Sequence, residues 1–598
     1  MYVVVLTCFV LALALYFAYR QGDPMHNVLQ GHTDEEYDYI IVGAGSAGSV
    51  VAARLAEDSD NKVLLLEAGG HYSERPSFFQ SPLMWAMGLK TEYDWEYYTK
   101  PQEKSSFGLK GQRSYWPRER VLGGTSCING VQYTRGILFD FDEWEAAGCT
   151  GWGYKEVLPY FLKSEDIHIE SLKSSPYHSQ GGPIAVSYGH VTELNEHILK
   201  AGQRLGYDVT DYNAKDQHGF STVPKSLRDG VSARSGLEYI GKKQMRNLHV
   251  SLQSFATKIQ IDKSDKTAKG VYYIKHGSKF YVKARREIII SGGTINTPQL
   301  LLLSGIGPSD HLKEKNIPVI TDLPVGQNLQ DHLYIPLLSH INQSLSITID
   351  DVESYWMKLR FSLQGKGIYS TSTLDTSAFL HLVNPNVGKR YPDIQMIFEA
   401  TLYSSNVLNY EDYIAHALLN SDAKQHGFTS AICLTRPFSR GQITLKSNDP
   451  FDHPTIDPKY LEDERDVNTL IGGIRVWEKL METPEMKALG VDIDRMKMPF
   501  CSKHKFRSDE YWECLIRHIG ISMYHHSGTC KMGPIEDHST VVDPELRVKG
   551  IQGLRVADAS VFPNVTSGNI NAPVIMVGEK AADLIIGKDT VSEFRRNI

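Results

Sequence analysis

The sequence predicts an α/β protein that contains a Rossmann-like dinucleotide-binding unit together with at least one further domain. Residues 39–55 show a short apolar strand, a glycine-rich turn and a helix in direct succession. Residues 63–67 form a second apolar strand that ends in an acidic residue. The chain of 598 residues is also longer than a single hydrophobic core usually fills. A dinucleotide-binding lobe and a second lobe account for these observations.

The glycine-rich turn has the spacing G-x-G-x-x-G. Gly43 permits a tight turn, Gly45 lets the backbone approach a pyrophosphate, and Gly48 lets the helix pack closely on the strand. The free N–H groups at the start of the helix favour phosphate binding. Glu67 follows at about the expected distance of 20 residues, where a carboxylate accepts the ribose hydroxyls. The predicted contacts of this unit are Gly43, Gly45, Ser46, Ala47, Gly48, Glu67 and Ala68.

The overall composition argues against a nucleic-acid partner. The formal net charge is −7, and the chain has no Lys/Arg-rich block, low-complexity tract or internal repeat. Proteins that bind nucleic acid usually carry a basic patch or stripe. Hydrophobic residues make up 41% of the chain and charged residues 22%, which is ordinary for a globular protein.

The N-terminal segment 1–20 is apolar from Tyr2 to Tyr19 and ends at Arg20. The run is marginal in length for a membrane span and long for the core of a signal peptide, and no basic residue precedes it. We expect it to direct the chain into the secretory pathway. Cleavage would release a secreted protein, whereas retention of residues 2–19 would anchor it to a membrane, and the sequence weighs the two about equally.

Cysteine usage leaves one pairing open. Cys8 lies in the N-terminal segment, which leaves six of the seven cysteines for the rest of the chain, without a C-x-x-C pair. Cys501 and Cys514 bracket a short polar segment, and a disulfide or two free thiols are equally compatible with the sequence. The triplet NQS at Asn342 is a candidate glycosylation site.

Four longer segments carry a family resemblance. RERVLGGTSCINGVQYTRG at 118–136 resembles the first signature of the glucose–methanol–choline (GMC) flavin oxidoreductases. GTINTPQLLLLSGIG at 293–307 is similar to the second signature, and LPVGQNLQDH at 323–332 to a further segment. Residues 541–585 resemble the family's C-terminal segment almost throughout. The resemblance covers residues 37–586.

This resemblance implies a bipartite fold: a Rossmann-like FAD-binding domain assembled from separate segments, and a substrate-binding domain built on an antiparallel sheet. We place the FAD-binding domain at residues 37–130, 220–330 and 520–590. The substrate-binding domain then takes residues 131–219 and 331–519.

The resemblance also implies the cofactor and its contacts. Some relatives attach FAD covalently through a histidine of the first signature, but Ile128 occupies that position here, so noncovalent FAD is expected. Glu119 departs from the signature, which prefers Gly or Ala. Asp558 matches a ribityl and pyrophosphate contact, with an ordinary helix cap as the alternative, and Ala256 matches the strand beside adenine. The implied contacts beyond the glycine turn are Val121, Gly124, Thr125, Asn129, Gly130, Val131, Ala256, Asp558, Ala559, Asn571, Ala572 and Pro573.

The family pattern Y-H-x-x-G-T begins at Tyr524 and makes His525 the candidate base. His526 occupies a variable position, and on extended backbone it should face away from its neighbour. Asn569 matches the second catalytic position, although Asn571 is the alternative for that role. His332 is expected to be structural, packing near the cofactor. The sequence predicts neither a metal site nor a serine nucleophile, since metal-ligand spacing and the G-x-S-x-G elbow are both missing.

The chemistry that this pairing implies is oxidation of an alcohol. A histidine with a pKa near neutrality removes the hydroxyl proton while hydride passes to FAD, and Asn569 stabilises the developing alkoxide. The expected partners are a small alcohol substrate and oxygen or a quinone-like electron acceptor. The alternatives are an FAD-containing hydroxynitrile lyase without redox turnover, or an inactive secreted member of the family.

Overall fold

The computed structural model describes residues 29, 31, 33–71, 80–242, 245–382, 391–402, 408–419 and 424–596. The predicted signal or anchor segment at residues 1–20 lies outside this part. Within the described ranges, none of the helices is both long and apolar enough to cross a membrane.

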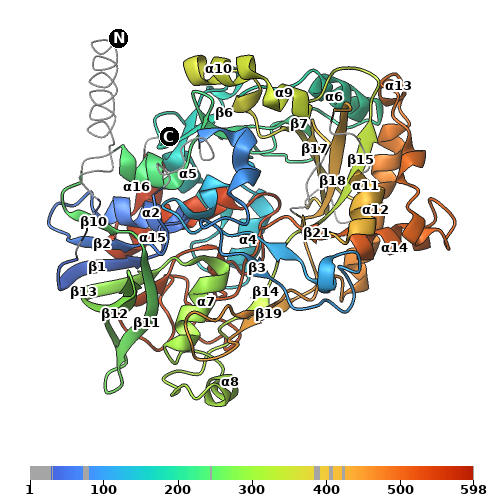
Figure 1. Cartoon of the computed structure of the whole chain (residues 1–598). Helices are drawn as coiled ribbons and strands as arrows, with labels where there is room; N and C mark the ends of the chain where they lie inside the picture. The colour runs from blue at the N-terminus through green and yellow to red at the C-terminus, as the bar shows by residue number, and fades with distance from the viewer. Residues whose placement is uncertain are drawn as a thin grey trace, which may run out of the picture.

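A seven-stranded sheet forms the first lobe, on the left of Figure 1. The glycine turn follows the central strand β1, which runs parallel to β2 with Ile40 beside Leu64. The carboxyl ends of parallel strands meet at one edge of a sheet, so the turn after β1 and Glu67 after β2 lie together. The strands are β10 (Leu248–Ser251), β2 (Val63–Leu66), β1 (Glu36–Val42), β13 (Ser278–Ile290), β12 (Thr267–Lys275) and β11 (Ser254–Asp262) in order, with β22 (Leu554–Val556) parallel to β13.

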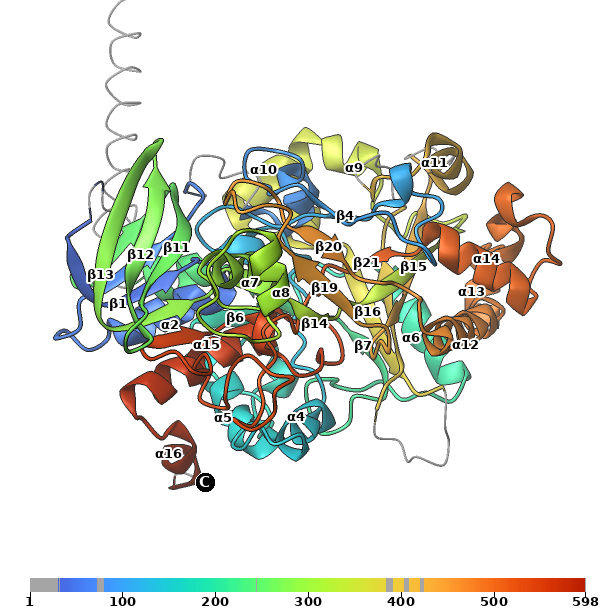
Figure 2. The ribbon, with the colours of Figure 1, turned by 90° about the horizontal axis from the view of Figure 1, so that it is seen from below.

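Two helices distant in sequence pack together beside these parallel strands. They are α2 (Ser46–Leu55), which follows the glycine turn, and α15 (Asn571–Ile586), near the C-terminus (Figure 2). A Cβ at Gly578 would lie 2.9 Å from the carbonyl oxygen of Ala47, so glycine is what permits this approach. The C-terminal segment is thereby fixed to the dinucleotide-binding turn. Helix α7 (Gly293–Leu303) packs against β11 of the same lobe.

A six-stranded antiparallel sheet forms the second lobe, on the right of Figure 1. Its strands are β21 (Ile521–Ser522), β15 (Leu333–His340), β18 (Gly427–Leu434), β17 (Ile394–Glu399), β16 (Leu374–Leu380) and β7 (Gly219–Thr222) in order. The helices α6 (Leu194–Arg204), α12 (Glu464–Met481), α13 (Pro484–Lys487) and α14 (Asp509–Ile519) flank it. The predicted fold class, a Rossmann-like unit combined with an antiparallel sheet, is confirmed.

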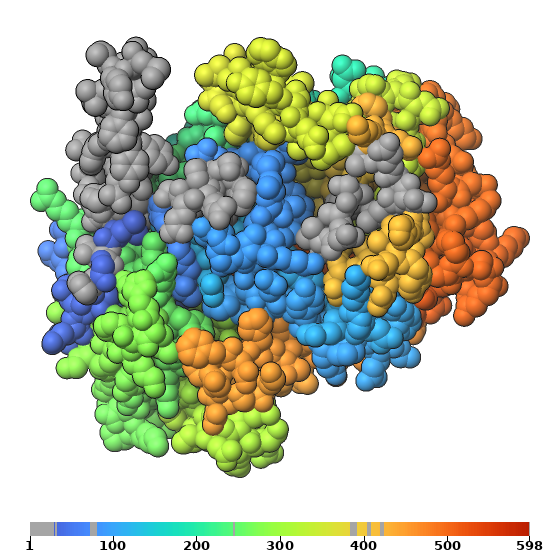
Figure 3. Space-filling view, viewed as in Figure 1, coloured from blue at the N-terminus to red at the C-terminus, as the bar shows by residue number. Residues whose placement is uncertain are grey.

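Smaller elements connect and cover the two sheets. Three short sheets contain β5 (Glu165–Ile167), β6 (Ile184–Ser187), β8 (Lys225–Arg228) and β9 (Val231–Ser232); β14 (Gln327–Leu329), β19 (Gly441–Thr444) and β20 (Thr455–Asp457); and β3 (Tyr97–Tyr98) with β4 (Tyr115–Trp116). The remaining α-helices are α4 (Leu138–Ala146), α5 (Tyr154–Ser164), α8 (Ser309–Glu314), α9 (Ile349–Glu353), α10 (Tyr355–Gln364), α11 (Asp412–Leu419) and α16 (Thr590–Arg596). In the space-filling view, the blue segment that contains η2 (Pro82–Gly88), β3 and β4 covers the centre of one face (Figure 3).

Each large sheet has its own hydrophobic core. Ile40, Leu64 and Ile289 belong to the buried cluster around the first sheet. Ile397 and Trp477 belong to a separate cluster around the second. The chain crosses between the sheets several times, so each lobe is discontinuous in sequence.

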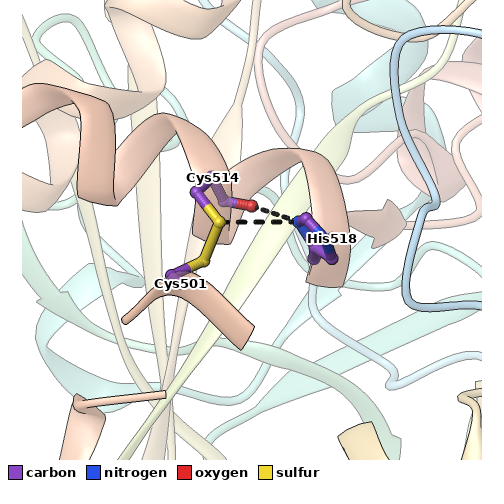
Figure 4. A group of neighbouring side chains, drawn as sticks. All are labelled: Cys501, Cys514 and His518. Carbon is purple, nitrogen blue, oxygen red and sulfur yellow. Dashed lines mark hydrogen bonds between the residues drawn. A yellow bond between two sulfur atoms is a disulfide. The ribbon is translucent and has the colours of Figure 1, made fainter. Parts of the chain in front are cut away.

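One disulfide fastens the outer part of the second lobe. Cys501 and Cys514 are bonded with a Cα–Cα distance of 5.9 Å, joining the turn at Pro499–Cys501 to α14 (Figure 4). His518 Nδ1 donates to the carbonyl oxygen of Cys514 at 2.7 Å, beside the bond. These three residues are close enough to ligate a metal, but sulfurs joined to each other are not the thiolates that metal binding requires. The other described cysteines are Cys127, Cys149, Cys433 and Cys530, all free and buried.

Candidate active site

The glycine turn forms a cradle whose shape depends on missing side chains. Gly43 has φ of 101°, and a Cβ there would lie 2.4 Å from the carbonyl oxygen of Ser291. A Cβ at Gly48 would lie only 1.9 Å from the carbonyl oxygen of Gly43, so the helix packs directly on the turn. A Cβ at Gly45 would meet no atom within 4 Å, because this residue borders a cavity. The start of α2 has no side-chain cap and offers its N–H groups to an anion there.

Glu67 is held in a fixed orientation at the end of β2. Its Oε2 accepts from the N–H of Ala44 at 2.9 Å, and its Oε1 accepts from the N–H of Gly69 at 2.8 Å. Burial raises the pKa of Glu67 to about 7, while these backbone donors act in the opposite direction. Each carboxylate oxygen keeps a further lone pair for a ribose hydroxyl. The cradle and this carboxyl group therefore fit a dinucleotide with an adenosine half.

A single cavity brings most of the predicted site residues together. It extends from the glycine turn to the two predicted catalytic side chains. The predicted residues that line it are Gly43, Gly45, Ser46, Ala47, Glu67, Ala68, Gly124, Thr125, Asn129, Gly130, Val131, Ala256, His525, Asp558, Ala559, Asn569 and Asn571.

Four predicted contacts lie behind this lining. Gly48 faces the turn rather than the cavity, as its packing requires. Val121 is buried and pairs with Gly70 through the backbone. Ala572 and Pro573 are buried in the first turn of α15. Their role in this structure is to support the lining residues next to them.

Two lining residues have their orientation set by local hydrogen bonds. Asn129 Oδ1 accepts from the N–H of Val131 at 3.0 Å, which leaves the amide Nδ2 to donate elsewhere. Asn571 Oδ1 accepts from the hydroxyl of Ser46 at 2.7 Å, so this asparagine belongs to the dinucleotide end. Ala256 lies on β11, whose start at Ser254 is separated from the end of β10 by residues 252–253.

Asp558 connects three segments of the chain. Its Oδ1 accepts from the N–H of Ser560 at 2.8 Å, which is the helix cap considered as the alternative. Its Oδ2 accepts from the N–H of Gly293 at 2.9 Å and from the hydroxyl of Thr297 at 2.6 Å. Asp558 also lines the cavity, so capping and a place at the cofactor site are combined in one side chain.

His525 faces the cavity and contacts two neutral polar side chains. Its Nε2 lies 3.2 Å from Nδ2 of Asn569, and its Nδ1 lies 2.9 Å from Nδ1 of His332. Gln395 Nε2 donates to Oδ1 of Asn569 at 3.3 Å, so the asparagine amide turns its own nitrogen toward His525. An amide nitrogen only donates, and Nε2 of His525 is therefore the accepting atom at the cavity.

His526 lies outside the lining of the cavity. Its ring packs on Trp116 with ring centroids 3.6 Å apart, and the side chain is fully buried. Its Nε2 lies 3.4 Å from the hydroxyl of Ser522 and 3.7 Å from a carboxylate oxygen of Asp331. The two adjacent histidines therefore occupy different environments, and only His525 meets the cavity.

The loop that carries His525 is held by one buried carboxyl group. Asp331 accepts from the backbone N–H of His525 at 2.8 Å, from the hydroxyl of Ser522 at 2.5 Å and from the hydroxyl of Tyr460. Tyr524 has φ of 64°, a left-handed conformation that a bulky residue rarely adopts. Such strain persists only where the surroundings impose it, and it lies here directly before the candidate base.

The expected pKa near neutrality for His525 is wrong. Burial lowers the pKa of His525 well below its usual range, and the positive charges of Arg118 and of His332, when that ring is protonated, act in the same direction. The two side chains that contact its ring are neutral groups, so no carboxylate offsets the loss of water. The imidazole is therefore uncharged throughout the neutral range and available as a proton acceptor.

Three further residues at the site were not predicted. Arg118 lines the cavity and brings a positive charge to it, although burial lowers the pKa of this arginine. It stands first in the quoted signature at 118–136, so the signal was present in the sequence. Gln132 lines the cavity, and Gln395 contacts Asn569 from β17. Gln132 also lies within that signature, whereas Gln395 belongs to no local pattern that would have identified it.

Glu119, the departure from the family signature, also lines the cavity. Both of its carboxyl oxygens are buried without a hydrogen-bond partner among the described residues. Burial, reinforced by the charge of Asp94, raises the pKa of Glu119 well above its usual range. This side chain is therefore held as the neutral acid.

The geometry at the inner end of the cavity suits a hydroxyl group. Nε2 of His525 can accept a proton, and Nδ2 of Asn569, 3.2 Å away, can donate a hydrogen bond to the same oxygen atom. A hydroxyl oxygen bound between these atoms becomes more stable as it loses its proton, because the amide donor strengthens with the developing charge.

Comparisons with known proteins agree with this arrangement. Models of the GMC oxidoreductase family match residues 37–334 and 437–578. Glucose dehydrogenase (FAD, quinone) of Drosophila melanogaster is 38% identical over 92% of this chain and 87% of that protein. Human mitochondrial choline dehydrogenase is 37% identical over 93% of this chain and 90% of that protein.

Solved structures give the same result. A pyridoxine 4-oxidase from Mesorbium loti superimposes with a TM-score of 0.78 at 27% identity, over 91% of this chain and 98% of that one. A formate oxidase variant from Aspergillus oryzae superimposes with a TM-score of 0.82 at 26% identity, over 93% and 99% of the two chains.

Proposed function

The chain belongs to the GMC oxidoreductase family, an assignment that makes it an FAD-dependent alcohol oxidoreductase, and we propose how its own residues carry out the reaction. The predicted family, cofactor and reaction type are thereby confirmed. His525 is the base that takes the hydroxyl proton at Nε2. Asn569 donates a hydrogen bond from Nδ2 to the oxygen as charge develops on it. The single observation that supports these roles is their 3.2 Å contact at the cavity.

The cofactor and the protein contribute different parts of the reaction. FAD, when bound, accepts two electrons and the carbon-bound hydrogen as hydride. The protein's contribution is to hold the hydroxyl oxygen between His525 and Asn569, to accept its proton and to exclude water. Arg118 adds positive charge near the place where negative charge develops. A well-placed general base contributes roughly 10²–10⁴-fold to such a step.

We further propose that FAD is bound without a covalent link. Ile128 is a buried aliphatic residue at the position where a histidine would attach the cofactor. Precipitation of the purified protein with acid should release all of the flavin into the supernatant. Flavin that remains in the protein pellet would contradict this proposal.

The proposed substrate is a polyhydroxylated alcohol such as a sugar. Gln132 lines the cavity, and its Oε1 is buried without a hydrogen-bond partner among the described residues. A buried amide oxygen of this kind is costly unless a ligand satisfies it, and a second hydroxyl of the substrate would do so. Glucose dehydrogenase (FAD, quinone) is among the similar proteins, and by analogy we propose a quinone-like electron acceptor.

We propose that the protein enters the secretory pathway through residues 1–20 and is released, with retention as a membrane anchor as the alternative. The Cys501–Cys514 disulfide supports this proposal, because disulfides persist in oxidising compartments. Asn342 is exposed and is the proposed glycosylation site. Secretion with loss of the N-terminal segment would be seen as a shortened N-terminus in protein collected from the culture medium.

One experiment tests the substrate proposal. Purified protein is mixed without oxygen with D-glucose, choline or benzyl alcohol, and loss of flavin absorbance near about 450 nm is followed. We expect D-glucose to reduce the flavin fastest and 1,4-benzoquinone to reoxidise it faster than oxygen does. Gln132→Leu should weaken D-glucose binding and leave reduction by benzyl alcohol unchanged. Faster reduction by choline or benzyl alcohol than by D-glucose would contradict the sugar proposal.

A further inference from the structure

A continuous row of hydrogen bonds passes behind the candidate base. The carbonyl oxygen of Thr435 lies 3.0 Å from Nε2 of His332, whose Nδ1 lies 2.9 Å from Nδ1 of His525. On the cavity side, Nε2 of His525 lies 3.2 Å from Nδ2 of Asn569. His332 is fully buried, and its ring stands nearly perpendicular to that of His525, at 89°.

The direction of each hydrogen bond in this row is determined by its first member. A carbonyl oxygen only accepts, so Nε2 of His332 must carry a hydrogen. Burial lowers the pKa of His332 to about 4, so its ring is neutral and holds only that one hydrogen. Nδ1 of His332 is therefore a bare acceptor. The hydrogen in the contact between the two histidines must then belong to Nδ1 of His525.

The other end of the row leads to the same assignment. Gln395 Nε2 donates to Oδ1 of Asn569, which leaves Nδ2 of Asn569 facing His525. An amide nitrogen has no lone pair to offer, so it donates and Nε2 of His525 accepts. Two independent neighbours thus require the same tautomer of His525, with its hydrogen on Nδ1.

From this arrangement we infer that His332 is a positioning residue that selects the reactive tautomer of His525. The inference rests on the proposed role of His525 as the base. Only the tautomer with a bare Nε2 can take a proton at the cavity. The other neutral tautomer would present an N–H group to the substrate hydroxyl and could not act as a base.

Backbone hydrogen bonds fix the position of His332 relative to His525. The N–H of Met523 donates to the carbonyl oxygen of His332 at 2.7 Å, which ties its backbone to the loop that carries His525. Asp331, its neighbour in the chain, accepts from the backbone N–H of His525 at 2.8 Å. Consecutive residues therefore fix the backbone and the ring of the base. His332 lies outside the cavity lining, so it acts through His525 and not on the substrate.

The test compares two variants that differ in hydrogen bonding but not in shape. His332→Asn retains an oxygen that can accept from Nδ1 of His525, and His332→Leu has nearly the same shape without an acceptor. The FAD-loaded proteins are mixed without oxygen with whichever of D-glucose, choline and benzyl alcohol reduces the wild type fastest. We expect the Leu variant to be reduced on the order of 10²-fold more slowly than the Asn variant. FAD content and melting temperature should be matched between the two.

The pH profile separates this role from a merely structural one. The groups whose charges act on His525 are Arg118 and, when it is protonated, His332, while the adjacent His526 has a lowered pKa of its own. The ratio of two neutral tautomers does not depend on pH. Flavin reduction in the Leu variant should therefore be slower than in the Asn variant by one constant factor from about pH 6 to 9. A ratio of the two rates that changes with pH within this range would overturn the inference, because a tautomer ratio does not depend on pH.

Equal rates in the Leu and Asn variants would also overturn the inference, whether both are fast or both are slow. If the Leu variant does not retain FAD, His332→Met replaces it as a variant without a nitrogen or oxygen acceptor. His525→Ala is measured in parallel. Normal reduction in that variant would instead show that the proposed base is wrong, which distinguishes failure of the proposed function from failure of this inference.

Discussion

Asn569 is held between two polar side chains, with its Nδ2 at 3.2 Å from Nε2 of His525 and its Oδ1 at 3.3 Å from Nε2 of Gln395. The glutamine thus determines which end of the asparagine amide faces the base. If the amide were reversed, two acceptors would face each other at the site of the substrate hydroxyl. The hydrogen-bond donor to the developing alkoxide therefore depends on a residue of β17, in the other lobe.

Gln395→Met should slow flavin reduction by releasing the Asn569 amide. The loss of one neutral hydrogen bond is worth about 1 kcal/mol, which corresponds to roughly a fivefold lower rate. Gln395 Nε2 also lies 3.2 Å from the hydroxyl of Ser377, so Ser377→Ala is the matched control. Stopped-flow reduction measures both variants. An equal effect of the two substitutions would show that the slower rate does not come from loss of the Gln395–Asn569 hydrogen bond in particular.

The rate of flavin reduction should be nearly independent of pH across the neutral range. Burial lowers the pKa of His525 well below its usual range, so the ring is already an uncharged acceptor at neutral pH. Protonation then removes the base only as the pH falls well into the acidic range. Reduction is followed without oxygen in buffers from about pH 5 to 9. A fall in the reduction rate centred at about pH 6.5, the ordinary pKa of histidine, would contradict this account.

Glu67→Gln should weaken retention of FAD and leave the reduction rate of the loaded enzyme unchanged. The amide nitrogen of glutamine would face one of the N–H groups of Ala44 and Gly69, which now donate to the carboxylate. Hydrogen bonds to a charged acceptor are worth about 1.5–3 kcal/mol, so affinity should fall on the order of 10- to 100-fold. Equilibrium titration of the apoprotein with FAD measures the affinity. A large fall in reduction rate per bound FAD would show that this role is misassigned.

Glu119→Gln should stabilise the FAD-free protein, and the gain should grow as the pH rises. Burial raises the pKa of Glu119 well above its usual range, so folding opposes ionisation of this side chain. Below the unfolded-state pKa both states hold the proton and no cost arises. At higher pH the unfolded chain releases the proton, and the wild type loses stability until the folded-state pKa is passed.

Melting temperatures of the apoproteins measured from about pH 4 to 8 check this prediction for Glu119. The difference in melting temperature between Glu119→Gln and the wild type should be small at about pH 4 and increase toward pH 8. Glu103→Gln is the control, since it removes the same charge from an exposed position. A difference that is constant with pH would mean that packing, and not ionisation, causes the change.

The sequence predicted those parts of the site that are formed by residues close together in the chain. Spacing alone identified the glycine turn, the helix after it and Glu67, because all three lie close together in residues 39–67. Resemblance extended this to His525 and Asn569, which the structure places in contact. The Gln395–Asn569 contact spans 174 residues, and the His332–His525 contact spans 193, so neither has a local pattern.

The pKa of His525 could not be predicted for a related reason. The motif identified the residue, but its pKa depends on burial and on Arg118 and His332, which are distant in sequence. The same holds for Glu119, which was recognised only as a departure from a pattern. Its unusual state arises because it is buried at a cavity wall without a partner among the described residues.

The central claim is that His525, and not its neighbour, is the base, and it is tested most directly by measuring anaerobic flavin reduction in two matched variants. His525→Ala should lower the rate roughly 10²–10⁴-fold, because it removes the proton acceptor at the cavity. His526→Ala should change the rate by less than about tenfold and chiefly lower the melting temperature, because that ring packs on Trp116 outside the cavity. Both proteins are compared at equal FAD content, with the same alcohol. A large fall in the rate of flavin reduction in His526→Ala, together with a wild-type rate in His525→Ala, would contradict the account.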